Sequence, residues 1–334
     1  MSEPPASSAT VPEGAVRSYH GQPVIKQPVW TWEIPTYFFT GGLGGASAGL
    51  AYLSELRGND VLGRRAWGTA LVAVGVSPVL LTSDLGKPLR FPNMLRMFKV
   101  TSPMSVGSWL LSGSGAATAV ATANAWTGLL PTAGRAARPA AALLGLPLST
   151  YTAALIANTA VPVWNDARST LPFVFASGAA LSAGALAVAT TPVSHAGPAR
   201  RLALGGAAIE LGLNEVMKKR LGDLAEPYEH GASRKFTQLS RAFILGGSAV
   251  LAGGRKSRVA AAASAGLLSA GALCARWSIF KAGLQSAADP GQVIGPQRAA
   301  IERRERTGAA RAIPRVSEPD PSIGSPANSQ STMR

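Results

Sequence analysis

The chain has 334 residues, of which 47% are hydrophobic and only 15% are charged, below the roughly 25% of an ordinary soluble domain. Its net charge is +15, yet the basic residues lie between apolar runs and in the C-terminal tail, without the interleaved aromatic residues of a nucleic-acid surface. The composition therefore argues against a soluble domain and a nucleic-acid partner. It predicts an all-α integral membrane protein whose basic residues face lipid headgroups.

The first 32 residues are polar and contain no apolar segment of the kind that forms the core of a signal peptide. The first apolar run begins at Glu33, just after Trp30 and Trp32. A carboxylate at a helix N-terminus is favoured by the helix dipole, so capping alone could explain Glu33. Gly41 and Gly45 have the spacing of a close-packing surface between helices.

Eight apolar runs approach the ~20 residues that a spanning helix needs, which predicts about eight transmembrane helices in two bundles. The seventh run is short and rich in glycine, so seven spans are the alternative. The predicted spans are Glu33–Glu55, Ala66–Asp84, Met104–Leu130, Pro139–Val163, Thr170–Thr191, Arg201–Met217, Phe236–Gly253 and Val259–Phe280.

The connection over residues 84–103 mixes basic and large apolar side chains, a pattern that predicts a short amphipathic helix on the membrane surface. An ordinary solvated loop is the alternative. A docking surface or a headgroup site is the functional interpretation. Its charged residues are Asp84, Lys87, Arg90, Arg96 and Lys99, of which Arg90, Arg96 and Lys99 are the candidates for docking a partner.

Polar residues inside spans are costly and often functional. Glu210 lies in the middle of the sixth predicted span, and Asn214 shares its helix face. They form either a proton path or a structural hydrogen bond between helices. Tyr151, in the fourth span, is a packing residue, an anchor at the membrane interface or a ligand contact.

The cofactors that this chain could hold by itself are restricted by its cysteine and histidine residues. Cys274 is the single cysteine, which excludes a disulfide or an iron–sulfur cluster held by this chain alone. His20, His195 and His230 lie outside the apolar runs, so we expect no haem within the membrane. No metal site is predicted.

The predicted organisation is a polar segment over residues 1–32, a transmembrane domain over 33–281 that includes the interfacial loop 84–103, and a basic, largely disordered tail over 282–334. Lysine and arginine residues are almost equally divided between the two sets of loops. The basic tail favours a multi-pass protein of the cell membrane with both termini in the cytoplasm.

Two stretches resemble the NrfD/PsrC family. Trp30–Phe39 followed by Gly41–Gly45 is similar to the first helix of that family. Asp84–Pro88, continuing through Ser102–Trp109, is similar to its connection between the second and third helices. The resemblance covers roughly residues 19–110.

This resemblance implies a membrane subunit of a multi-subunit oxidoreductase such as polysulfide reductase. Such subunits have about eight helices and no haem, and they bind a quinone. Electrons pass between the quinone and a ferredoxin-like iron–sulfur subunit, which serves a molybdopterin catalytic subunit. Whether menaquinone or ubiquinone is used does not follow from the sequence.

The resemblance also places the quinone site in the first four helices, with polar contacts from early helix one and from a tyrosine of helix four. The family's asparagine and histidine of helix one are absent here. We expect Glu33 and Asp84 to exchange protons, and we rank them above Tyr151, which the predicted span places in mid-membrane. The expected quinone contacts are Trp32, Tyr37, Lys87, Trp109 and Tyr151.

Two other functions fit the sequence. A small-molecule or ion transporter would explain an intramembrane Glu210, although the internal repeats of many transporters are not evident. A catalytically silent membrane anchor would recruit a redox complex without binding quinone.

Overall fold

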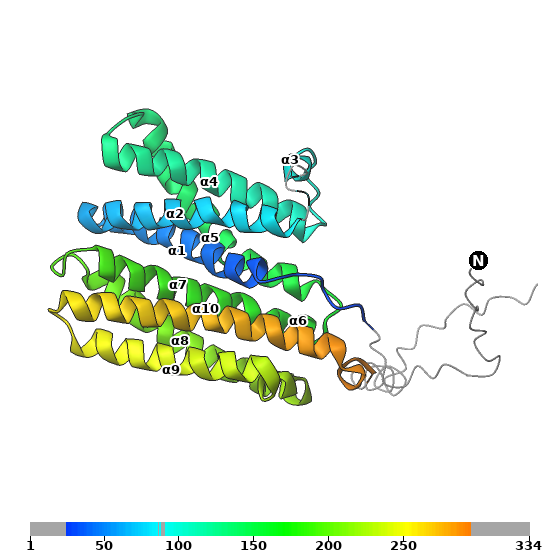
Figure 1. Cartoon of the computed structure of the whole chain (residues 1–334). Coiled ribbons are helices and arrows are strands. Elements are labelled where there is room, and N and C mark those ends of the chain that lie inside the picture. The colour runs from blue at the N-terminus through cyan, green and yellow to red at the C-terminus, as the bar shows by residue number, and fades with distance from the viewer. Residues whose placement is uncertain (1–24, 86, 88–90, 295–334) are drawn as a thin grey trace, which may run out of the picture. The chain divides into compact units, whose positions relative to one another are not determined.

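The computed structural model describes residues 25–85, 87 and 91–294, and this part of the chain contains helices and no strand, as predicted. Eight of its helices have twenty or more residues (Figure 1). They are α1 (Glu33–Leu56), α2 (Asp60–Asp84), α4 (Pro103–Thr127), α5 (Pro131–Ala157), α7 (Leu171–Thr190), α8 (Gly197–Leu221), α9 (Gly231–Gly253) and α10 (Arg258–Ala288). The short elements are α3 (Phe91–Met94), α6 (Pro162–Asp166) and the 3₁₀ helices η2 (Ala167–Ser169) and η3 (Gly222–Tyr228).

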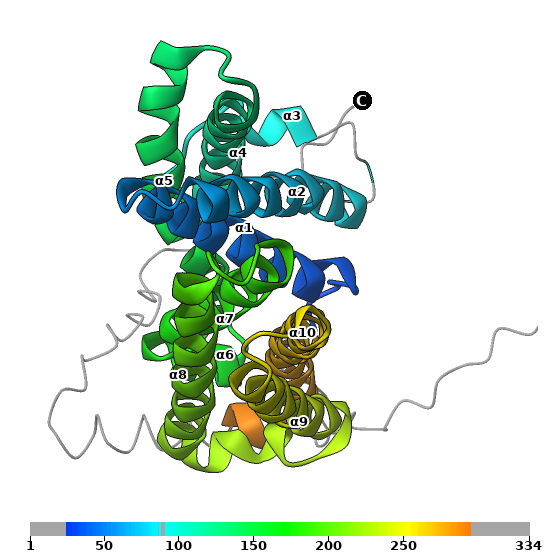
Figure 2. The ribbon, with the colours of Figure 1, turned by 90° about the vertical axis from the view of Figure 1, so that its left-hand side faces the viewer.

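The long helices within residues 25–293 pack mainly on their neighbours in the chain. Helix α1 contacts α2, α5 and α7, while α4 lies against α2 and α5. Helix α7 contacts α8 and α10, and α9 packs along α10. Figures 1 and 2 show α1, α2, α4 and α5 on one side and α7 to α10 on the other, with α1 beside α7.

Four of the long helices in the described residues, α2, α5, α7 and α10, are both long and apolar enough to cross a membrane. The other four, α1, α4, α8 and α9, have 23 to 25 residues, or about 35–38 Å at about 1.5 Å per residue. Their polar and small residues lower the mean hydropathy. The protein is thus a membrane protein with four candidate spans, and eight spans in two bundles stay a prediction.

Several helix boundaries differ from the predicted spans. Helix α2 begins at Asp60 rather than Ala66, because the Asn59 side chain caps it by accepting a hydrogen bond from the Leu62 N–H at 3.2 Å. Helix α5 begins at Pro131, a favourable first-turn position for proline, and ends at Ala157. Tyr151 therefore lies six residues, about 9 Å, from the end of its helix, so its predicted mid-span position is wrong.

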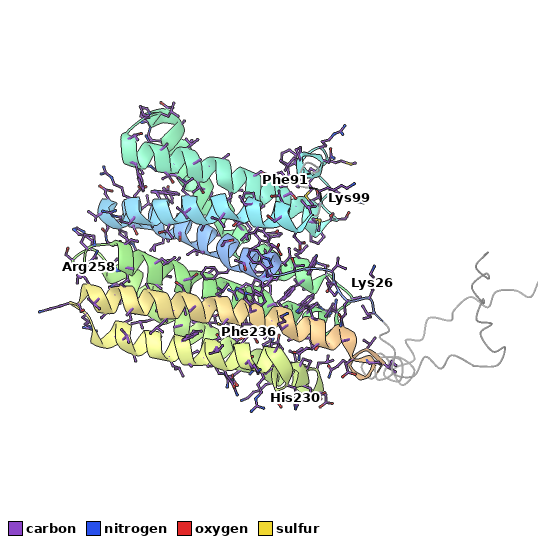
Figure 3. All side chains as sticks on the ribbon, viewed as in Figure 1. Lys26, Phe91, Lys99, His230, Phe236 and Arg258 are labelled. Atoms are coloured by element: carbon purple, nitrogen blue, oxygen red, sulfur yellow. The ribbon has the colours of Figure 1, made fainter. Side chains whose placement is uncertain are left out.

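The segment before α1, the loop 84–103 and the connection between α8 and α9 lie at one end of the helices. Figure 3 shows Lys26, Phe91, Lys99 and His230 at this end and Arg258 at the opposite end. We call the first of these the α1-start end. In the described part of loop 84–103, the expected amphipathic helix is reduced to the four residues of α3.

Candidate functional site

Tyr37 and Tyr151 form the polar centre of the candidate site. Their hydroxyl oxygens are 2.6 Å apart, which joins α1 to α5 by a hydrogen bond in which either group can donate. The two rings meet edge to face, with centroids 6.4 Å apart. Tyr37 is completely buried, whereas Tyr151 is partly exposed. Both had been predicted as quinone contacts, and the structure brings them together.

Helix α4 packs closely on Tyr151. A Cβ atom placed on Gly107 would lie 2.2 Å from the Tyr151 ring and 2.7 Å from its hydroxyl oxygen. Only a residue without a side chain allows this approach, so the Tyr151 ring is held between α4 and Tyr37.

Glu33 and Asp84 also lie close together, at the α1-start end. The Thr31 hydroxyl contacts the Glu33 carboxylate. The same hydroxyl oxygen of Thr31 is 3.3 Å from Asp84 Oδ1. The Thr31 backbone N–H donates to the same Asp84 oxygen at 3.4 Å. Glu33 is one helical turn before Tyr37 and therefore on the same side of α1.

The tryptophans predicted as walls of the site are both exposed. Trp32 is 57% exposed, and Trp109 is 42% exposed and packs edge to face on Phe98. Sequence reasoning did not assign the inward position to Trp30, which stacks on the buried Trp164 of α6 with centroids 5.9 Å apart. The approach of Trp164 to α10 depends on Gly283, a contact that no local sequence pattern indicates.

The predicted docking cations lie at the surface of the α1-start end. Arg96 and Lys99 are exposed, as is Lys87. Arg90 lies outside the described residues.

A second buried polar group lies between α7, α8 and α10. Glu210 and Arg276 form an ion pair at 3.7 Å, with side-chain exposures of 0% and 2%. Arg276 also donates to the Phe175 carbonyl at 2.8 Å and lies 4.2 Å above the Phe175 ring. Asn214 does not contact the Glu210 carboxylate, because its amide donates to the Glu210 backbone carbonyl at 2.8 Å.

Arg276 is the residue that sequence reasoning missed. It is a single cation inside the eighth apolar run, which is the signal that could have marked it as the partner of Glu210. Gly178 makes room for the pair, since a Cβ atom there would lie 2.5 Å from the guanidinium and 2.7 Å from the carboxylate. Phe175 connects the pair to α1 through Phe38, at a ring separation of 5.8 Å.

Two cavities in the described part of the chain are lined by neither Tyr37 nor Tyr151. One is an apolar groove of about 450 Å³ along α1, α2, α4 and α7, which includes Thr40, Val76 and Trp126. Thr40 faces Ser77 of α2, at 2.9 Å, whereas Tyr37 faces α5, so the groove is on another side of α1. The other is a polar cavity of about 410 Å³ between α8, η3 and α9.

The family described as Polysulphide reductase, NrfD, matches residues 19–213. The chain belongs to the NrfD family. The match covers more than half of the chain, from before α1 to within α8, and extends well past the residues that carried the resemblance. No curated protein matches this chain. Its NrfD membership and its apolar helices identify it as a membrane protein of the kind found in oxidoreductase complexes.

Proposed function

We propose that this NrfD protein binds a quinone headgroup beside Tyr151, where α1, α4 and α5 meet. The observation that carries the proposal is the 2.6 Å contact between the Tyr37 and Tyr151 hydroxyls. One hydroxyl donates to the other, which leaves one O–H free to donate to a ligand. Because Tyr37 is enclosed and Tyr151 is partly exposed, the free donor belongs to Tyr151.

The residues around Tyr151 suit a quinone headgroup. A phenol O–H is a good donor to a carbonyl oxygen, and the surface of α4 at Gly107 fixes the ring in one orientation. A bound quinone supplies two-electron, two-proton chemistry. Glu33 at the start of α1 and Asp84 at the end of α2 hold carboxylates at the α1-start end, where protons can be exchanged with water.

The electrons have to pass to another subunit, since no haem or iron–sulfur cluster is expected in this chain. We assign the partner as a ferredoxin-like iron–sulfur subunit that serves a molybdopterin catalytic subunit, in keeping with NrfD membership. Lys99, which Figure 3 marks at the α1-start end, and Arg96, three residues before it, are exposed and provide a basic surface for this partner. A partner at this end would bring its cluster close to Tyr151.

Glu210 is assigned to proton transfer in the same proposal. Its carboxylate oxygens have no hydrogen-bond partner among the described residues, although Arg276 neutralises the charge. A carboxylate with free lone pairs can accept a proton from water that enters between the helices. Asn214 supports the backbone of this turn and not the carboxylate.

The test is Tyr151→Phe in the assembled complex, with Tyr52→Phe as the matched control. Tyr52 is on the same helix as Tyr37 but near its opposite end. Loss of one hydrogen bond worth about 1.4 kcal/mol should raise the KM for quinol about tenfold, while the control stays at the wild-type value. Equal KM values for the two variants would contradict the proposed headgroup contact.

A further inference from the structure

The polar cavity between α8, η3 and α9 combines basic side chains from two helices. Arg234 and Arg241 are seven residues apart and share one face of α9, and Lys218 reaches the cavity from the last turn of α8. Glu229 is the one acidic residue in its lining, and Arg241 is also paired with Glu215 outside the lining. With Glu215 counted, three cations face two carboxylates, which leaves a net positive charge that favours an anionic ligand.

Tyr228 provides a buried donor in this cavity. Its side chain is 3% exposed, lines the cavity, and has no hydrogen-bond partner among the described residues. Burial raises the pKa of the Tyr228 phenol, so the group keeps its proton and can donate. A buried hydroxyl without a partner is costly, and a ligand oxygen would satisfy it.

The N-terminus of α9 also lacks a side-chain cap. His230 occupies the N-cap position without a side-chain hydrogen bond to the helix, and the first turn has no acidic residue. Arg234 and Lys235 instead place two positive charges near the positive end of the helix dipole, which is unfavourable in the absence of an anion. The free N–H groups of a helix N-terminus bind phosphate well.

Apolar side chains beside the cavity indicate the source of such an anion. Val216 on α8 and Leu239 on α9 are exposed and lie within two residues of the lining residues Lys218 and Gln238, and Leu245 is exposed further along α9. In a membrane protein this surface meets acyl chains, while the cavity lies at the α1-start end, marked by His230 in Figure 3. A phosphate group attached to acyl chains would match both features.

We propose that this cavity binds the phosphate headgroup of an anionic phospholipid, with Arg234, Lys218 and Tyr228 as its contacts. The ammonium of Lys218 and the guanidinium of Arg234 neutralise the phosphate, and the Tyr228 hydroxyl donates to one of its oxygens. The acyl chains lie along α8 and α9. This site is separate from the proposed quinone site and does not depend on it.

The experiment uses the full-length protein in nanodiscs that contain phosphatidylglycerol and phosphatidylcholine. Native mass spectrometry counts the phosphatidylglycerol molecules that stay bound after release into detergent. The variants are Arg234→Gln and Tyr228→Phe, with Lys235→Gln as the matched control, because Lys235 is adjacent and exposed but does not line the cavity. Thermal unfolding of each variant verifies that it is folded.

Arg234→Gln should reduce retained phosphatidylglycerol about fivefold, the effect of one surface charge on an anionic lipid. Tyr228→Phe should reduce it as well, and Lys235→Gln should retain the wild-type amount. Equal retention in Arg234→Gln and Lys235→Gln would overturn the proposal. If inorganic phosphate displaced the lipid and stabilised the protein against thermal unfolding as much as the lipid does, the cavity would be a site for free phosphate. That result would overturn the lipid assignment.

Discussion

Glu210 and Arg276 are the most deeply buried ion pair in the described part of the chain. Removal of one partner leaves the other charge buried and unpaired, which costs about 3–5 kcal/mol of stability. A single Glu210→Gln variant therefore combines two effects. It removes an ionisable group, and it leaves the Arg276 guanidinium buried without a counter-charge. The two effects can be separated only if both charges are removed together.

We predict that Glu210→Gln lowers the stability of the protein, and that Glu210→Gln with Arg276→Gln recovers most of it. If Glu210 transfers protons, the double variant should still turn over quinol slowly while it binds quinone as well as wild type, because glutamine cannot ionise. The measurements are thermal unfolding in detergent and turnover per folded complex. Full turnover in a stable double variant would show that the pair is structural.

At the scale of elements, the contact between α1 and α5 sets the position of the two tyrosines. Gly45 meets Gly145 so closely that a Cβ atom on Gly45 would lie 2.2 Å from the Gly145 carbonyl oxygen. The predicted close-packing surface is confirmed at Gly45, whereas Gly41 faces Tyr37 of its own helix. The Tyr37–Tyr151 hydrogen bond thus depends on a helix crossing about two turns away.

We predict that Gly45→Ala destabilises the protein, whereas Gly49→Ala is tolerated. An added methyl group at position 45 meets backbone, which cannot move out of the way as a side chain would, and overpacking of this kind costs about 1–3 kcal/mol. A Cβ atom on Gly49 would meet nothing within 4 Å. Thermal unfolding of the two variants provides the comparison. Equal unfolding temperatures would show that α1 and α5 can move apart to accommodate the added methyl group.

The loop after α2 is predicted to dock the iron–sulfur subunit, and charge reversal tests this role. Arg96→Glu with Lys99→Glu should release the iron–sulfur subunit, because it reverses two exposed charges at the α1-start end. Arg255→Glu with Lys256→Glu makes the same change in the loop before α10, at the opposite end marked by Arg258. Co-purification measures the bound partner. If the Arg255/Lys256 variant released the partner and the Arg96/Lys99 variant did not, the docking surface would lie at the end opposite to the one proposed.

At the scale of the whole molecule, the sequence predicted the helical class and the approximate place of each long helix in the described residues, because apolar runs of about 20 residues are separated by basic loops. The ends of the helices were less predictable. Helix α5 starts eight residues before the predicted Pro139, since Pro131 and the small residues after it fit a first turn as well as a loop. Helix α9 likewise starts at Gly231, before the apolar run begins.

The candidate site was predictable in its members but not in its pairings. Tyr151, Glu33, Asp84 and Glu210 were singled out from residue type and position, whereas Tyr37 was named only through the resemblance to the NrfD/PsrC family. The contact of Tyr37 with Tyr151 depends on the crossing of α1 and α5. Arg276 and Glu210, 66 residues apart in the sequence, meet beside Gly178 of α7. Such pairings are set by tertiary packing at glycines, which the sequence of one chain does not encode locally.

The most direct test of the proposed quinone site is photolabelling of the assembled complex with an azido-quinone, followed by mass spectrometry of the peptides. The site beside Tyr151 predicts labels on the first half of α1 and the last turns of α5, around Tyr37 and Tyr151. Excess quinol should suppress them. Specific labels confined to α7, α8, α9 and α10 would contradict the site and require the quinone to bind elsewhere.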